Sequence, residues 1–156
     1  MLKIALVTFL TLAASAFAST PELDTLMGTL EGHGQWKSPD GSKGTWTSVL
    51  TVEKAEKGAK MKEVLTIHTP DQKDHVEEMS WDLIKKEHGF FDIAIEGKLA
   101  GWGHCFGHIC QINSAGREPG SRWAETIKVT KHGLVRFGTE HSDKFQVSWH
   151  GISKKK

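Results

Sequence analysis

The chain has 156 residues, of which 20 are Lys or Arg and 19 are Asp or Glu, so its formal net charge is +1. This length fits one domain. The near-neutral charge argues against a nucleic-acid partner, because such binding needs a surplus of cations to neutralise phosphates.

The first 18 residues have the pattern of a secretory signal peptide. Lys3 precedes an uncharged apolar run, and Ala16 and Ala18 occupy the two small-residue positions of an A-x-A cleavage signal. The run is too short for a transmembrane helix, which takes about 20 apolar residues. We therefore expect cleavage after Ala18, a single domain over 19–156, secretion or a periplasmic location, and no stable insertion into a membrane.

A short helix is expected at 20–28, and the rest of the chain has the pattern of β-strands. Thr20 suits the cap of this helix, Pro21 its first turn and Gly28 its end. Beyond it, segments with alternating apolar and polar residues are separated by turns rich in Gly, Pro, Asn, Asp and Ser. These turns are expected at 39–44, 56–60, 69–74, 86–89, 98–101, 113–121, 131–133 and 140–144.

Short antiparallel strands joined by short turns form a meander with two exposed edges, and closure into a barrel removes both edges. We therefore predict an all-β fold, an antiparallel up-and-down β-barrel of about 8–10 strands. A two-sheet β-sandwich is the alternative, but it needs more long crossover connections than the one that 113–121 provides.

Both cysteines of the chain lie in "GHCFGHICQ", 103–111. A two-residue turn at 107–108 places Cys105 opposite Cys110 in a non-hydrogen-bonded pair, where Cα atoms approach to about 4.5 Å and a disulfide fits. Alternation puts His104 on the opposite face from Cys105, and His108 lies in the turn, so these four side chains do not converge as a zinc site requires. We predict a disulfide and no metal site, with a metal or free thiols as alternatives.

The apolar side of the strands carries all six tryptophans, and this is the side that we turn inward. It predicts either a filled core or an aromatic cavity for a ligand. The same side supplies the polar candidates Glu63 and Glu77, which suit strand ends in water, and His104 and Glu125, which have apolar neighbours. The apolar set is Trp36, Trp46, Met79, Trp81, Leu83, Phe91, Trp102, Phe106, Trp123, Phe137, Phe145 and Trp149, and the candidate ligand-binding residues are Trp46, Trp81, Trp102, His104, Phe106, Trp123 and Glu125.

The stretch "LMGTLEGHGQW", 26–36, resembles the start of lipocalin-like (calycin) barrels, especially nitrobindin-like and related small bacterial families. These begin with a leucine-rich turn and a G-T-x-x-G-x-G stretch. The resemblance implies a barrel that binds a small hydrophobic molecule. Nitrobindin-like members bind haem through a histidine near the C-terminus, and the matching position is His150. Alternation directs His150 to solvent, which departs from that pattern, so we expect no cofactor and keep haem as the alternative.

The first functional expectation is therefore an exported module that carries or sequesters a small apolar ligand. One alternative is a barrel enzyme with His104 and Glu125 as an acid–base pair. Another is an exported inhibitor or protein–protein module that presents the loop at 113–121. No G-x-S-x-G, H-E-x-x-H or phosphate-loop motif occurs, which weakens the enzyme alternative, and we assign no catalytic residue.

Overall fold

The structure is a computed structural model that describes residues 26–116 and 119–156. The expected signal peptide at 1–18 and most of the helix expected at 20–28 lie outside these residues.

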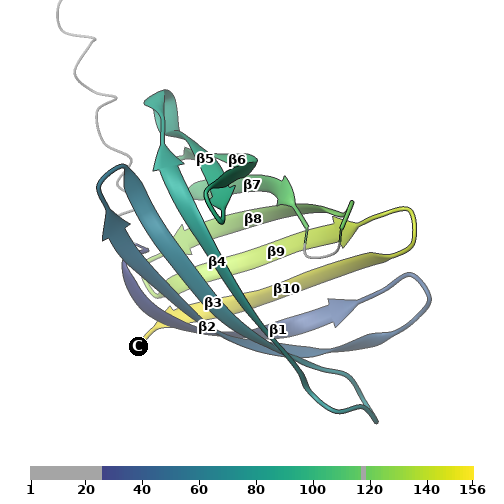
Figure 1. Cartoon of the computed structure of the whole chain (residues 1–156). Helices are drawn as coiled ribbons and strands as arrows, with labels where there is room; N and C mark the ends of the chain where they lie inside the picture. The colour runs from purple at the N-terminus through teal and green to yellow at the C-terminus, as the bar shows by residue number, and fades with distance from the viewer. Residues whose placement is uncertain (1–25, 117–118) are drawn as a thin grey trace, which may run out of the picture.

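The described chain forms one closed antiparallel barrel in which each strand pairs with its neighbours in chain order and β1 pairs with β10 (Figure 1). A short 3-10 helix, η1 (Glu87–Gly89), precedes β5. The predicted all-β up-and-down barrel is confirmed. The strands are β1 (Gly28–Lys37), β2 (Lys43–Ala55), β3 (Gly58–His68), β4 (His75–Lys85), β5 (Phe90–Ile95), β6 (Lys98–Phe106), β7 (Ile109–Ala115), β8 (Arg122–Thr130), β9 (Gly133–His141) and β10 (Gln146–Lys155).

The hairpin of β6 and β7 has the predicted register. Phe106 pairs with Ile109, and Cys105 pairs with Cys110 across the two-residue turn. Gly107 has a φ of 60°, a backbone conformation that glycine adopts without a Cβ clash. Cys105 and Cys110 form a disulfide, as predicted.

One end of the barrel interior is filled by an apolar core. Each strand from β1 to β9 contributes side chains to this core, and the disulfide is part of it. Burial of these side chains is the main source of stability, at about 25 cal/mol per Å² of apolar surface. The buried residues are Leu26, Leu30, Leu50, Val52, Ala59, Met61, Trp81, Leu83, Phe91, Ile93, Cys105, Cys110, Ile127 and Leu134.

The predicted inward face is wrong for β6. Cys105 is buried, whereas Trp102 is 50% exposed and Phe106 is 80% exposed on the outer surface. The reason is Gly103, which lies inward where the ring of Phe91 occupies the space that a Cβ atom would take. The glycines and the cysteine of β6 therefore face the interior, and its aromatic residues face out.

The prediction is also wrong for Phe137 in β9. Phe137 is 50% exposed, whereas Leu134, Arg136 and Glu140 are buried. The inward side of β9 thus carries an arginine and a glutamate, which find partners inside the barrel, and Phe137 occupies an outward position.

Candidate functional site

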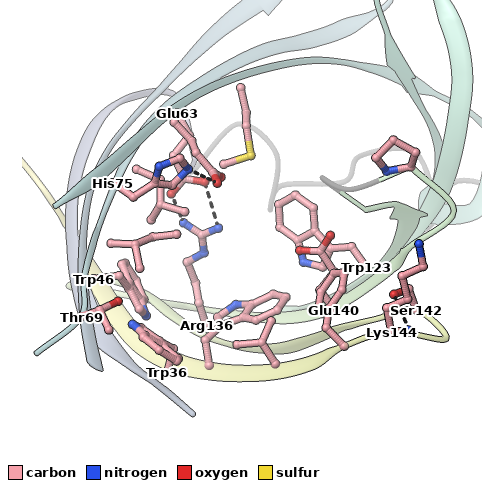
Figure 2. A pocket seen from close by; sticks show the side chains of 18 residues that line it. Trp36, Trp46, Glu63, Thr69, His75, Trp123, Arg136, Glu140, Ser142 and Lys144 are labelled. Atoms are coloured by element: carbon pink, nitrogen blue, oxygen red, sulfur yellow. Dashed lines mark hydrogen bonds and ion pairs between the residues drawn. The ribbon is translucent and has the colours of Figure 1, made fainter. Parts of the chain in front are cut away.

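A cavity of about 740 Å³ occupies the end of the barrel opposite the apolar core. Its aromatic lining comes from strand ends that meet at this end of the barrel: Trp36 from the end of β1, Trp46 from the start of β2, Trp123 from the start of β8 and Trp149 from the start of β10. Figure 2 shows Trp36 and Trp46 on one side of Arg136 and Trp123 on the other. Aliphatic parts of the lining are Leu65, Ile67, Met79 and Val147.

The tryptophans are held by the pairing of the strands. Trp36 and Trp149 are direct cross-strand partners. Trp123 meets Trp149 edge-on, with ring centroids 5.9 Å apart, and meets Trp81 at 5.6 Å. Such tilted and edge-on contacts are the favoured geometry for aromatic pairs. The wall of the cavity is therefore continuous with the core through Trp81.

A buried ionic cluster separates the cavity from the core. Arg136 of β9 lies between two carboxylates, Glu63 of β3 and Glu125 of β8. Arg136 Nε donates to Glu125 Oε1 at 2.8 Å and Nη2 to Oε2 at 3.3 Å, while Nη1 and Nη2 donate to the two oxygens of Glu63. Trp149 Nε1 donates to Glu125 Oε1 at 3.4 Å. We call these three charged residues the floor cluster.

The floor cluster is fully within the barrel, since Glu63 is only 2% exposed and Glu125 only 4% exposed. Burial alone lowers the pKa of the Arg136 guanidinium, but the charges of Glu125 and Glu63 and their hydrogen bonds outweigh it and raise the pKa. Arg136 is therefore a permanent cation, and its fork of donors fixes both carboxylates in place. The guanidinium also lies 5.9 Å from the ring centroid of Trp46, a cation–π distance.

Further polar side chains lie nearer the mouth of the cavity. His75 Nε2 lies 2.9 Å from Glu77 Oε1 at the start of β4. On the other wall Ser121 donates to Glu140 Oε1 at 2.7 Å. The lining therefore has a fixed charged floor, aromatic walls and a polar rim.

The structure brings together only some of the residues predicted for the site. Trp46 and Trp123 line the cavity, whereas Glu125 is outside the lining and is held behind it by Arg136. Trp81 lies in the apolar core. Trp102 and Phe106 lie on the outer surface, because β6 has the opposite orientation to the predicted one.

His104 is likewise separated from the cavity. Its Nε2 atom lies 3.1 Å from the carbonyl oxygen of His88, and its ring stacks on Phe90 with centroids 4.2 Å apart. Glu125 points into the barrel, so the structure does not bring the proposed acid–base pair together.

Three features of the site were missed or undervalued from the sequence. Arg136 lies among apolar neighbours, and only its spacing of two from Leu134 marks it as inward. Glu63 was expected near a strand end in water but lies in the floor. Trp36 and Trp149 were placed inward but not among the ligand-binding residues, and they line the cavity.

Among the residues that the structure describes, no group of three or more His, Cys, Asp or Glu is placed to hold a metal ion. His150, the position suggested for haem, is exposed on the outer surface. No helix within the described ranges is long and apolar enough to cross a membrane.

Solved structures of other proteins share this barrel fold. The S-type phycobiliprotein lyase CPES from Guillardia theta matches with a TM-score of 0.66 and 9% identity, covering 86% of this chain and 90% of that one. Rv2717c from M. tuberculosis matches with a TM-score of 0.53 and 12% identity, covering 87% of this chain and 98% of that one. The shared property is the fold.

These likenesses show the barrel fold. The lipocalin-like (calycin) resemblance of the sequence, including its nitrobindin-like part, stays a prediction. No family model matches the sequence, and no curated protein matches it.

Proposed function

We propose that this chain is an exported β-barrel that binds a small, mainly apolar molecule in its cavity and carries or sequesters it. The observation that carries the proposal is the cavity of about 740 Å³, with four tryptophans in its walls and the floor cluster beneath them. Ligand cavities typically measure about 300–1,000 Å³ and combine apolar, aromatic walls with a few fixed polar groups. This cavity has the same size and composition.

The walls favour a ligand with a flat ring system. Trp46, Trp123 and Trp149 offer ring faces and edges around one space, and aromatic contacts are worth about 0.5–1.5 kcal/mol beyond burial of area. The floor cluster supplies charged groups whose geometry is fixed before a ligand enters, so a polar end of the ligand has a defined place to hydrogen-bond. The fold shared with a phycobiliprotein lyase supports a role with small molecules.

Export is the second part of the proposal. It rests on the signal-peptide pattern of residues 1–18 and gains support from the disulfide, because disulfides persist in oxidising compartments. Intact-mass measurement of the chain expressed in full should give a protein that begins at Ser19. A protein that retains residues 1–18 in the cytosol contradicts this part of the proposal.

The cavity is tested with a neutral apolar fluorophore such as N-phenylnaphthylamine. Wild-type protein should bind it and enhance its emission, and native mass spectrometry of the freshly purified protein should show a retained small molecule. Leu65→Trp fills the cavity from β3 and should abolish binding of the probe. The matched control is Val64→Trp, because Val64 lies on the outer side of the same strand and outside the cavity lining.

Two outcomes contradict the proposal. One is a folded wild type that binds no probe and retains no molecule. The other is equal binding by wild type and Leu65→Trp, which would place the probe elsewhere. The alternative of a barrel enzyme using His104 and Glu125 gains no support, since these side chains lie on opposite sides of the barrel wall.

A further inference from the structure

On the described strands β6 to β10, the outer surface of the barrel carries no carboxylate. On β6 to β10, all within the described part of the chain, every second residue from Trp102 to Lys154 faces outward, and none of these is Asp or Glu. The glutamates of these strands, Glu125 and Glu140, point inward and are buried. We call this surface the acid-free face.

An apolar row crosses the acid-free face. Cross-strand pairing places Phe106 beside Ile109, Ile109 beside Lys128, Lys128 beside Val135 and Val135 beside Ile152. Phe106 is 80% exposed and Ile109 is 45% exposed, at the tip of the disulfide-closed hairpin. Exposed apolar side chains on four strands, with Lys128 of β8 between them, form a patch of the kind that marks an interaction surface.

The charged side chains of the acid-free face are all basic. Arg122, Lys128 and Lys154 are its fixed cations, and His104, His141 and His150 accompany them. Arg122 and Lys128 have no carboxylate as a cross-strand partner, whereas Lys154 lies at the edge of the face, beside Glu31 of β1.

The other half of the barrel differs. There, exposed carboxylates pair with lysines: Glu78 with Lys62 at 3.0 Å and Asp92 with Lys86 at 2.8 Å. The acid-free face ends at β5, where Asp92 lies beside Trp102, and at β1, where Glu31 lies beside Lys154 and pairs with Lys156. The asymmetry therefore runs around the barrel and is not a property of the whole surface.

We propose that the acid-free face docks on the surface of an anionic phospholipid bilayer. The aromatic and aliphatic side chains of the apolar row would lie at the boundary of headgroups and acyl chains, while lysine and arginine stems reach along it to lipid phosphates. Charge complementarity selects anionic lipid, because each Lys or Arg near such a surface contributes about 1 kcal/mol. The disulfide fixes the hairpin, so Phe106 and Ile109 are presented without further ordering.

Charge and composition favour lipid over the other partners. A nucleic acid needs one cation for each phosphate that is neutralised, and three fixed cations over five strands are few for that purpose. A second copy of this chain would bring the same cations to the interface, and like charges would face one another. The proposal concerns the outside of the wall, so it does not rest on a ligand in the cavity.

The experiment is co-sedimentation of the protein, expressed in full with export, with vesicles of phosphatidylcholine alone or mixed with phosphatidylglycerol. We expect binding to the anionic vesicles that weakens as salt is added. Phe106→Ser should weaken binding about tenfold or more, because a buried Phe contributes about 1.5–3 kcal/mol. Lys128→Glu should weaken it about fivefold or more. Brominated lipids should quench the emission of Trp102, the tryptophan of the acid-free face, and Trp102→Phe should abolish that quenching.

The matched controls lie on the other half of the barrel. Val76→Ser removes an apolar side chain that is exposed on β4, and Lys62→Glu reverses a charge on β3. Both should bind vesicles like the wild type, and any contribution of residues 1–18 is common to all variants. Near-ultraviolet circular dichroism confirms that each variant is folded.

Several results would overturn the proposal. The first is no binding to either vesicle, and the second is binding that Phe106→Ser and Lys128→Glu leave unchanged. A third is salt-sensitive binding to a single-stranded oligonucleotide without vesicle binding, and a fourth is self-association that Phe106→Ser abolishes while vesicles have no effect. The last two results would assign the face to a nucleic acid or to a second copy.

Discussion

The indole ring of Trp46 covers Gly34, its cross-strand partner on β1. A Cβ atom on Gly34 would lie 2.6 Å from the Cε2 and Cζ2 atoms of the ring. Trp149 covers Gly138 of β9 in the same way. Each ring uses the space that the glycine leaves and lies against the barrel wall, so the large side chains line the cavity without filling it.

Adding a methyl group at Gly138 should push Trp149 off the wall. A Cβ atom there would lie 2.6 Å from Trp149 Cζ2 and 2.6 Å from the carbonyl oxygen of Ala124. Gly138→Ala should lower the free energy of unfolding by about 1–3 kcal/mol, the usual cost of overpacking, and should weaken probe binding. Urea unfolding and fluorescence titration measure the two effects. Thr139→Ala, one residue away on the outer surface, should change stability by less than about 0.5 kcal/mol; equal effects of both substitutions would contradict the account.

Removal of the central cation of the floor cluster should be severe. Arg136→Met removes the cation that both buried carboxylates, Glu63 and Glu125, contact, and breaking a buried ion pair in this way costs about 3–5 kcal/mol. Replacing both glutamates by leucine in the same chain should restore most of that stability, because apolar residues need no partner. The test is urea unfolding of the single and triple variants. A single variant as stable as the wild type would show that the cluster is not a structural unit.

The pH dependence separates the wild type from Arg136→Met. The pKa of Arg136 is raised in the folded state, so its contribution is complete below the unfolded pKa and is lost only as pH rises through the higher folded value. The wild type should therefore lose none of this contribution at neutral pH. In the variant the buried carboxylates are costly only when ionised, so the deficit in stability should shrink as pH falls. A deficit that does not shrink as pH is lowered would contradict this explanation.

The fold followed from local chemistry that the sequence shows directly. Period-two alternation and turn residues predicted the strands, and the two residues between Phe106 and Ile109 predicted the register that pairs Cys105 with Cys110. Each of these features depends on neighbours in the chain. They are readable without knowing which strands meet across the barrel.

The orientation of individual strands was harder to predict. Trp102 and Phe106 of β6 are more apolar than the glycine between them, so the aromatic residues were placed inward. In the structure Gly103 faces inward instead, because the ring of Phe91 occupies the space beside it. Arg136 was equally hard to place, because its burial depends on an ion pair with Glu63, which is 73 residues away in the chain. Packing partners across the barrel decide such positions, and no local pattern contains them.

The disulfide closes a short loop and should make a modest contribution. In the chain-entropy model a loop of this length is worth roughly 2 kcal/mol. Reduction should therefore lower the free energy of unfolding by about that amount, while the protein stays folded because the rest of the core is intact. Urea unfolding with and without a reductant measures the difference, and a Cys105→Ala, Cys110→Ala chain should be insensitive to reductant. Two free thiols in the oxidised, denatured protein would contradict the bond itself.

The two sides of the barrel wall predict opposite behaviour for Trp46 and Trp102. Trp46 is buried, lines the cavity and lies near Arg136, so Trp46→Ala should cost about 3–5 kcal/mol of stability and should weaken binding of the apolar probe. Trp102 is half exposed on the outer surface, so Trp102→Ala should cost much less and should leave probe affinity unchanged. Acrylamide quenching of tryptophan emission provides an independent check, because Trp102→Ala should remove the most accessible component and Trp46→Ala should not. Loss of probe binding in Trp102→Ala, with stability preserved, would return β6 to the inward orientation first expected from its sequence.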